Sequence, residues 1–243
     1  MKKSLSALIF SAAIVIAAFA LGNGISKRYT SKKTISVTGL GSENFTSDLI
    51  VWEGSFSVEN LNLKQAYQGL ENSKTIIKSY LIQKGVKDNE LVFKAVTNNR
   101  ITKAKYSNDG KYIGDEFLGY SLTQSLEVNS NDVDTIESIS REVTELLNEG
   151  IRFYSVPPRY YYTKIEDLKI EMISKATANA FTRAQKIAEN SGSQLGNLVS
   201  GNMGVFQITG QNSSEDYSWG GTFNTSSKEK TARITMKLIY ELK

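Results

Sequence analysis

Hydrophobic and polar positions alternate in several segments of the chain, which is the pattern of β-strands with one buried face. Residues 48–59 show it most clearly. Their apolar face consists of Ile50, Trp52, Phe56 and Val58, and their polar face of Glu53, Ser55, Ser57 and Glu59. Gly54 interrupts the apolar face, so we expect a bulge or a close backbone approach there. Further strands are predicted at 34–39, 91–106, 117–128, 198–208 and 231–240, with a turn at Gly39 and Gly41 after the first.

Three other segments repeat apolar residues at the spacing of an α-helix. The first stripe is Leu63, Ala66, Tyr67, Leu70, Ile77 and Leu81, and the second is Val133, Ile136, Ile139, Val143, Leu146 and Leu147. The third helix is expected from about Thr163 to Ser191. The first helix is expected to begin after a cap at Asn60 or Asn62 and to end at Gly85, and the second to begin after Asn131 and to end at Gly150. The third is expected to begin at a capping box of Thr163 and Glu166 and to end at Gly192.

The segments between these elements differ in composition. Residues 107–116 are polar and contain glycine, which predicts a hairpin-like connection. Residues 153–162 contain Pro157 and Pro158, the only prolines, so this segment is expected to be an edge strand or simply extended. Residues 209–230 are rich in Gly, Ser, Asn and Thr, and so long an insert is either functional or disordered.

Strands mixed with three helices indicate an α+β fold with a mixed or antiparallel sheet, preceded by an N-terminal hydrophobic helix. We expect an N-terminal membrane anchor or signal peptide at 1–26, a basic linker at 27–33 and one domain at 34–243.

The N-terminal segment indicates export from the cytoplasm. Lys2 and Lys3 precede an uncharged run from Leu5 to Leu21. Counted to Ile25, the run has roughly 20 residues, the length of a membrane-crossing helix. We therefore expect residues 5–25 to stay in the inner membrane as an anchor, with the domain on the periplasmic side. The alternative is a signal peptide cleaved after Ala18-Phe19-Ala20, which would release the domain into the periplasm.

The composition of the chain excludes several kinds of binding and catalytic site. Residues 1–33 hold six of the 29 basic residues and none of the 25 acidic ones, so the rest of the chain has a net charge of −2 and does not suggest nucleic-acid binding. The chain has no cysteine and no histidine, which excludes a Cys/His zinc site and a Ser-His or Cys-His nucleophile. We expect no cofactor and no tightly bound transition metal, although calcium held by carboxylates is compatible with the composition.

Two groups of residues are candidates for an interface. Ala176, Ala180, Ala184 and Ala188 are four residues apart, so they form a smooth stripe on the third helix. The stripe predicts packing on the sheet, or alternatively a helix–helix contact between subunits. Tyr160, Tyr161 and Tyr162 form an aromatic cluster, read as half-buried strand residues or as a surface that binds a partner.

Three pairs of adjacent acidic residues are carboxylate candidates for catalysis. They are Asp115-Glu116, Glu166-Asp167 and Glu215-Asp216. Adjacent residues on a strand or helix point apart, so none of these pairs makes a glycosidase-type site by itself.

Two motifs resemble a known family. Ile35-Ser-Val-Thr-Gly-Leu-Gly41, followed by Asp48-Leu-Ile-Val-Trp52, is similar to the opening of the SIMPL-domain proteins, also described as oxidative-stress-defence or periplasmic immunogenic proteins of bacteria. The Ala-rich segment from Ala176 to Gly192, with Leu195-Gly196 after it, resembles the long helix and turn of that family. The resemblance covers about residues 34–243, and the 209–230 insert is longer than the family pattern.

The resemblance implies a bacterial envelope protein with an α+β domain. Some members assemble into large rings, and no catalytic residues are established, so none is carried over to this chain. The expected function is therefore non-enzymatic: self-assembly, with a homo-oligomer as the product, or binding of a protein partner whose identity the sequence does not give. A role in envelope or oxidative stress defence follows from the resemblance alone. The alternative is a carboxylate-dependent envelope hydrolase or carbohydrate-binding enzyme.

The first prediction concerns the N-terminus. Protein extracted from membranes should have an intact mass that retains residues 5–25, because the apolar run is long enough to remain as an anchor. Mass spectrometry of the extracted protein measures this directly. A mature chain that starts near Leu21 would show that the segment is a cleaved signal.

Overall fold

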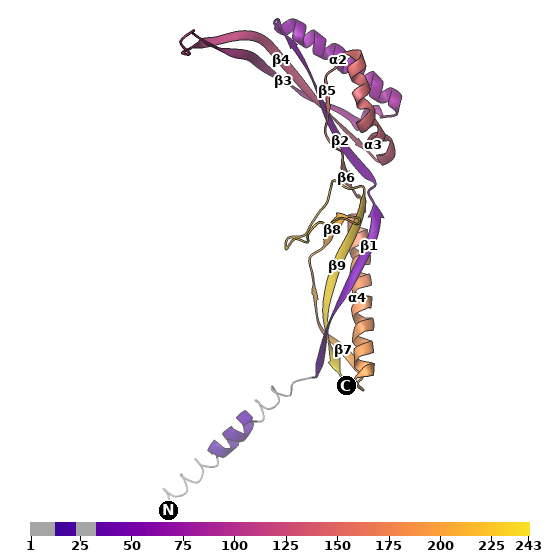
Figure 1. Ribbon diagram of the computed structural model, residues 1–243. Coiled ribbons are helices and arrows are strands. Elements are labelled where there is room, and N and C mark those ends of the chain that lie inside the picture. Colours follow the sequence, from indigo (N-terminus) through magenta and orange to yellow (C-terminus); the bar gives the residue numbers. More distant parts are fainter. Residues whose placement is uncertain (1–12, 23–32) are drawn as a thin grey trace, which may run out of the picture. The chain divides into compact units, whose positions relative to one another are not determined.

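The computed structural model describes residues 13–22 and 33–243 (Figure 1). Residues 13–22 are helical, and no helix within the described ranges is long and apolar enough to cross a membrane. The other residues of the expected anchor, and most of the 27–33 linker, lie outside the described residues. The fold is α+β with antiparallel sheets, as predicted.

Residues 34–243 contain nine strands, three α-helices and two short 3₁₀ segments. The strands are β1 (Thr34–Thr46), β2 (Leu49–Asn60), β3 (Leu91–Tyr106), β4 (Tyr112–Ser130), β5 (Phe153–Ser155), β6 (Arg159–Tyr161), β7 (Leu195–Met203), β8 (Gln207–Gly210) and β9 (Glu229–Leu242). The helices are α2 (Leu63–Lys84), α3 (Val133–Glu142) and α4 (Ile165–Asn190), and the 3₁₀ segments are η1 (Asp88–Glu90) and η2 (Val143–Glu149).

These elements form two compact units. Unit 1 contains the described residues up to Gly41, with Ile173–Gly204 and Thr235–Lys243. Unit 2 contains Ser42–Met172 and Val205–Ile234. The expected 34–243 domain therefore consists of two parts, which are described separately below.

Unit 2 is built on a sheet with the strand order β3-β4-β2-β5, and β6 also pairs with β2. Helices α2 and α3 cover one face of this sheet (Figure 1). Trp52 and Phe56 lie beneath them and are 0% and 2% exposed, which confirms the predicted face of β2. Gly54 lies on the same face, where an added Cβ would meet the ring of Phe153 at 2.2 Å. The glycine thus makes room for an aromatic ring.

The ends of the helices follow their predicted signals in most cases. The side chain of Asn62 accepts hydrogen bonds from two backbone N–H groups of α2, and Gly85 ends this helix in the left-handed conformation. Gly150 likewise ends η2. The cap of α3 is Asp132, so the prediction of Asn131 was wrong by one residue. The Asn131 amide instead donates to the Asp48 carbonyl oxygen at 2.7 Å.

Three predicted stripe residues are not buried. Leu63, Tyr67 and Leu147 are 41%, 51% and 57% exposed. Leu63 is the first residue of its helix, and Tyr67 is next to the buried Ala66, at the margin of the covered face. Leu147 falls in η2, where three residues per turn replace 3.6 and move it off the stripe.

Strands β3 and β4 extend beyond the rest of their sheet. Residue pairing between β2 and β4 stops at Asn60 and Tyr120, whereas β3 and β4 stay paired as far as Tyr106 and Tyr112. The connection between them is therefore shorter than the predicted 107–116, because β4 already begins at Tyr112. We call the paired residues 100–106 and 112–120, with their turn, the arm (Figure 1).

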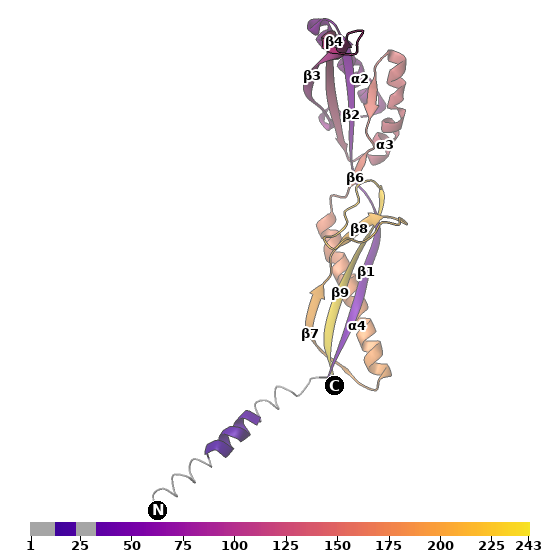
Figure 2. The ribbon, with the colours of Figure 1, turned by 60° about the vertical axis from the view of Figure 1, so that its left-hand side comes forward.

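In unit 1, helix α4 packs on a sheet with the strand order β1-β9-β7 (Figure 2). The predicted inward face of β9 is confirmed: Ile234, Leu238 and Tyr240 are buried and Met236 is partly buried. The predicted strand at 198–208 is two strands, because pairing with β9 is interrupted between β7 and β8.

The predicted turn at Gly39 and Gly41 was wrong, since β1 runs straight through both residues. A Cβ on Gly39 would lie 2.1 Å from the carbonyl oxygen of Ala176. The glycine therefore allows the backbone of α4 to approach the strand. Side chains of α4 bond the strand on both sides of this contact: Arg183 donates to the Thr38 carbonyl oxygen, and Asn179 accepts from the Leu40 N–H.

The second prediction tests this contact. Gly39→Ala should lower the free energy of unfolding by about 3 kcal/mol, because the added methyl group meets backbone that cannot move aside without displacing the helix. Urea melts measure the change. Thr38→Ala, a small change at an exposed neighbouring position, is the control. Equal stability of the two variants would contradict the close approach.

Candidate functional site

The alanine stripe is covered by the protein itself. Ala176, Ala180 and Ala184 are 0% exposed and Ala188 is 1% exposed in the single chain. Their side chains face the sheet of unit 1, where Ala180 and Ala184 join Val37 and Leu238 in one apolar cluster. Packing on the sheet therefore accounts for the stripe, and these four side chains offer no surface to a second subunit.

The tyrosine segment lies in unit 2, and its members differ. Tyr160 is buried, while Tyr161 and Tyr162 are half-buried. Tyr162 contacts Phe45 with ring centroids 4.8 Å apart and ring planes tilted by 54°. The segment lies beside β2 at the edge of the sheet, as expected for residues that follow two prolines.

The same segment contacts the 209–230 insert. The Tyr160 N–H donates to the Thr225 carbonyl oxygen at 2.7 Å, and the ammonium group of Lys230 donates to the Tyr160 carbonyl oxygen. Two features that were separate in the sequence therefore form one site, which we call the Tyr160–Lys230 site.

Lys230 is unusual in this site because its charged side chain is buried. It is 1% exposed, and burial lowers the pKa of its ammonium group to about 8. The negative charge of Glu215 acts in the opposite direction on this pKa but is the smaller effect. The ring centroid of Phe223 lies 6.0 Å from the ammonium nitrogen, within the range of a cation–π contact.

Glu215 holds the insert together. Its carboxylate accepts from the Gly210 N–H at 2.9 Å and from the side-chain amide of Asn224. These bonds favour the charged form and lower the pKa of the carboxyl group. Gln207 binds the outer part of the insert, donating to the Ser218 carbonyl oxygen and accepting from the Thr222 N–H. The insert is thus fixed at several points.

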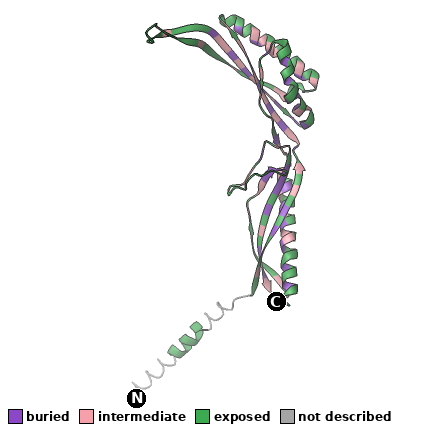
Figure 3. Cartoon of the chain, viewed as in Figure 1, coloured by how far each residue is buried: buried purple, intermediate pink, exposed green. Residues whose placement is uncertain are grey.

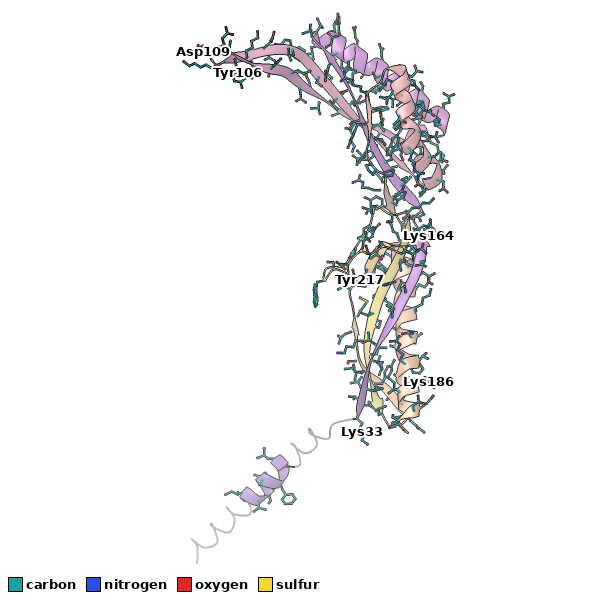
Figure 4. The ribbon with its side chains drawn as sticks, in the orientation of Figure 1. Lys33, Tyr106, Asp109, Lys164, Lys186 and Tyr217 are labelled. Carbon is teal, nitrogen blue, oxygen red and sulfur yellow. The ribbon has the colours of Figure 1, made fainter. Side chains whose placement is uncertain are left out.

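The outer part of the insert displays aromatic side chains. Trp219 is 100% exposed. Tyr217, which is labelled in Figure 4, is 55% exposed. The phenol of Tyr217 accepts a hydrogen bond from Arg233 of β9, which fixes its orientation.

The three acidic pairs lie in separate places. Asp115 and Glu116 are on the arm, and Glu116 is 3.5 Å from the ammonium group of Lys105. Glu166 pairs with Lys169 on α4. Residues 13–22 and 33–243 contain no group of three or more acidic, cysteine or histidine residues that could hold a metal ion.

The arm is the second candidate surface. Arg100, Phe117 and Tyr120 contact one another at its base, with the guanidinium 5.2 Å from the Phe117 centroid and the two rings 5.1 Å apart. Tyr106 and Tyr112 meet edge to face at the tip, 6.1 Å apart. The tip residues are marked in Figure 4 by Tyr106 and Asp109.

Sequence reasoning missed Lys230 and the arm. Lys230 continues the two-residue period of the inward face of β9, through Ala232 and Ile234. The sequence therefore indicated that this lysine would be buried, because it occupies an inward-facing position of the strand. The signal for the arm was weaker: the predicted strand at 91–106 is longer than the one at 48–59, but the sequence does not show how these strands pair and so does not locate the part left without β2.

The fold of these units is that of an α+β protein in which helices cover one face of antiparallel sheets. The sequence model of the family described as SIMPL, protein of unknown function (DUF541), matches residues 35–236. The chain therefore belongs to the SIMPL family, as the sequence motifs indicated. No curated protein matches the chain.

The third prediction concerns Lys230. Its folded pKa of about 8 lies below the value of about 10.4 of an unfolded lysine, so the unfolded chain binds more protons between these values. The free energy of unfolding should therefore rise with pH from about 8 to 10.5, by up to about 3 kcal/mol relative to Lys230→Met.

Urea melts at several pH values measure this difference. Lys237→Met removes an exposed lysine from the same strand and should keep the rise. If Lys230→Met keeps it too, the buried ammonium group is not its source.

Proposed function

We propose that this SIMPL-family chain is a non-enzymatic protein of the bacterial cell envelope that acts by assembling with copies of itself. The domain lies on the periplasmic side of the inner membrane, held there by residues 5–25. Its assemblies act in envelope or oxidative stress defence, a role supported only by the family resemblance.

The location is supported by the sequence pattern. An apolar run of roughly 20 residues after Lys2 and Lys3 has the length and charge order of an inner-membrane anchor. The net charge of the rest of the chain, −2, supports a partner other than nucleic acid.

The observation that carries self-assembly is the arm. Its ribbon is coloured mostly as exposed in Figure 3, and no described element packs on its outer part. It presents aromatic and aliphatic side chains to solvent: Tyr106 is 63%, Tyr112 58% and Ile113 63% exposed. A two-stranded ribbon is marginally stable in water by itself. Its free edges and exposed rings are therefore features that a protein contact would stabilise.

The surroundings of the acidic residues support a non-enzymatic role. Glu116 pairs with a lysine, Glu166 pairs with a lysine, and Glu215 binds backbone and amide groups of its own loop. One carboxylate of each acidic pair therefore has a contact within the chain, which supports a structural role for it.

The fourth prediction is the mass of the assembly. The full-length chain, extracted in mild detergent, should have a protein mass of several times 26.9 kDa at micromolar concentration, because the exposed surfaces of the copies become buried against one another. Light scattering coupled to size-exclusion chromatography separates protein mass from detergent mass. A protein mass equal to one chain at high micromolar concentration would refute self-assembly.

A further inference from the structure

The helix-facing side of the unit 2 sheet continues into the arm, where no described residue covers it. Leu122 of β4 is 4% exposed beneath the helices. Tyr120, two residues away and on the same face, is half-buried, and from there outward the side chains are mostly exposed (Figure 3). The face thus keeps its aromatic character after its cover has ended.

The register identifies the residues of this face. Arg100 pairs with Tyr120, Thr102 with Phe117, Ala104 with Asp115, and Tyr106 with Tyr112. Paired residues of antiparallel strands point to the same side, and so do residues two apart along β3. The register of β4 shifts after Gly119 and after Gly114, so Phe117 and Tyr112 are each three residues from the preceding member, and the ring contacts of Phe117 with Tyr120 and of Tyr106 with Tyr112 place them on this side. These eight residues therefore form one face, which we call the aromatic face. The opposite face carries Lys103, Glu116 and Lys105, which are charged.

The charges of the aromatic face suit it to pack against the same face of a second copy. Residues 100–120 contain four basic and three acidic residues, so two arms repel each other only weakly. On the aromatic face the positive group, Arg100, is at the base, and the negative group, Asp115, is nearer the tip. Two arms placed face to face in opposite directions would therefore bring unlike charges together.

The rings are distributed in the same self-complementary way. Phe117 and Tyr120 lie at the base, and Tyr106 and Tyr112 lie at the tip. Between them are the small residues Thr102 and Ala104, which let two ribbons approach closely. In an antiparallel pair each tip covers the base of the other arm, where Arg100 provides a cation for a tyrosine ring. A two-fold contact requires this kind of self-complementary surface.

We propose that the arms of two copies pack with their aromatic faces together and in opposite directions, which makes the arm a joint of the assembly. This inference rests on the self-assembly proposed above and names the surface that performs it. Six residues of strand span about 20 Å, so the joint is a small contact that acts alongside others in the assembly.

The chain has no cysteine, so a single introduced cysteine reports on one position only. Ala104→Cys places the thiol near the middle of the aromatic face, and Lys103→Cys places it on the opposite face of the same strand. The full-length variants are oxidised gently in detergent at equal concentration. Ala104→Cys should form at least about fivefold more disulfide-linked dimer than Lys103→Cys, because a disulfide needs Cα atoms within about 7 Å.

A second substitution tests whether the rings hold the joint. Tyr112→Glu in the Ala104→Cys chain should reduce the dimer to the level of Lys103→Cys. Tyr154→Glu, at a tyrosine 67% exposed on β5, is the matched control and should leave the yield unchanged. Thermal melts of each variant verify that the chain is folded.

The possible outcomes separate the two proposals. Equal cross-linking of the two cysteine variants in a protein that still has an oligomeric mass would refute the arm joint and leave self-assembly standing. A monomeric mass would refute both. Equal cross-linking together with Tyr112-dependent binding to vesicles of anionic phospholipid would assign the face to a membrane and also overturn the joint.

Discussion

The covering of one sheet face by helices is the constraint on which this structure depends. In unit 2, α2 and α3 bury Trp52 and Phe56, and in unit 1, α4 buries Val37 and Leu238. The two cases use different side chains. Large apolar groups fill unit 2, whereas alanine and glycine let the backbones of α4 and β1 come close together in unit 1. Where a sheet continues past its helices, as in the arm, the same constraint is unmet within the described chain.

Much of the fold could be predicted because local patterns determine it. The period of two placed the buried face of β2, and Asn62 and Gly85 marked the ends of α2 through hydrogen bonds within a few residues. Gly39 was misread because glycine is required both for turns and for close packing. Only the helix against it, about 140 residues farther along the chain, decides which of these roles applies.

The candidate site was predicted in parts. The tyrosine segment and the 209–230 insert were each noticed, but their contact depends on Lys230 reaching the Tyr160 carbonyl oxygen, 70 residues away in sequence. A buried cation of this kind is costly unless its donors are satisfied. The hydrogen bond and the ring of Phe223 offset part of that cost, while burial still lowers the pKa of the ammonium group. A buried lysine kept at such a cost fixes the insert against β6.

The two candidate surfaces differ in what they imply for assembly. The polar groups of the Tyr160–Lys230 site bond one another within the chain, although Trp219 and Tyr217 of the insert remain exposed. The arm is not covered in this way: Tyr106 and Tyr112 at its tip contact each other and are 63% and 58% exposed, and the contacts of Phe117 at its base include Arg100. A surface whose polar groups are hydrogen-bonded within the chain stabilises that chain. A surface whose aromatic side chains stay exposed to solvent is available to another chain. On this argument the polar contacts brace the insert within the chain, and the arm, whose face is left uncovered, is the surface that we propose contacts another copy.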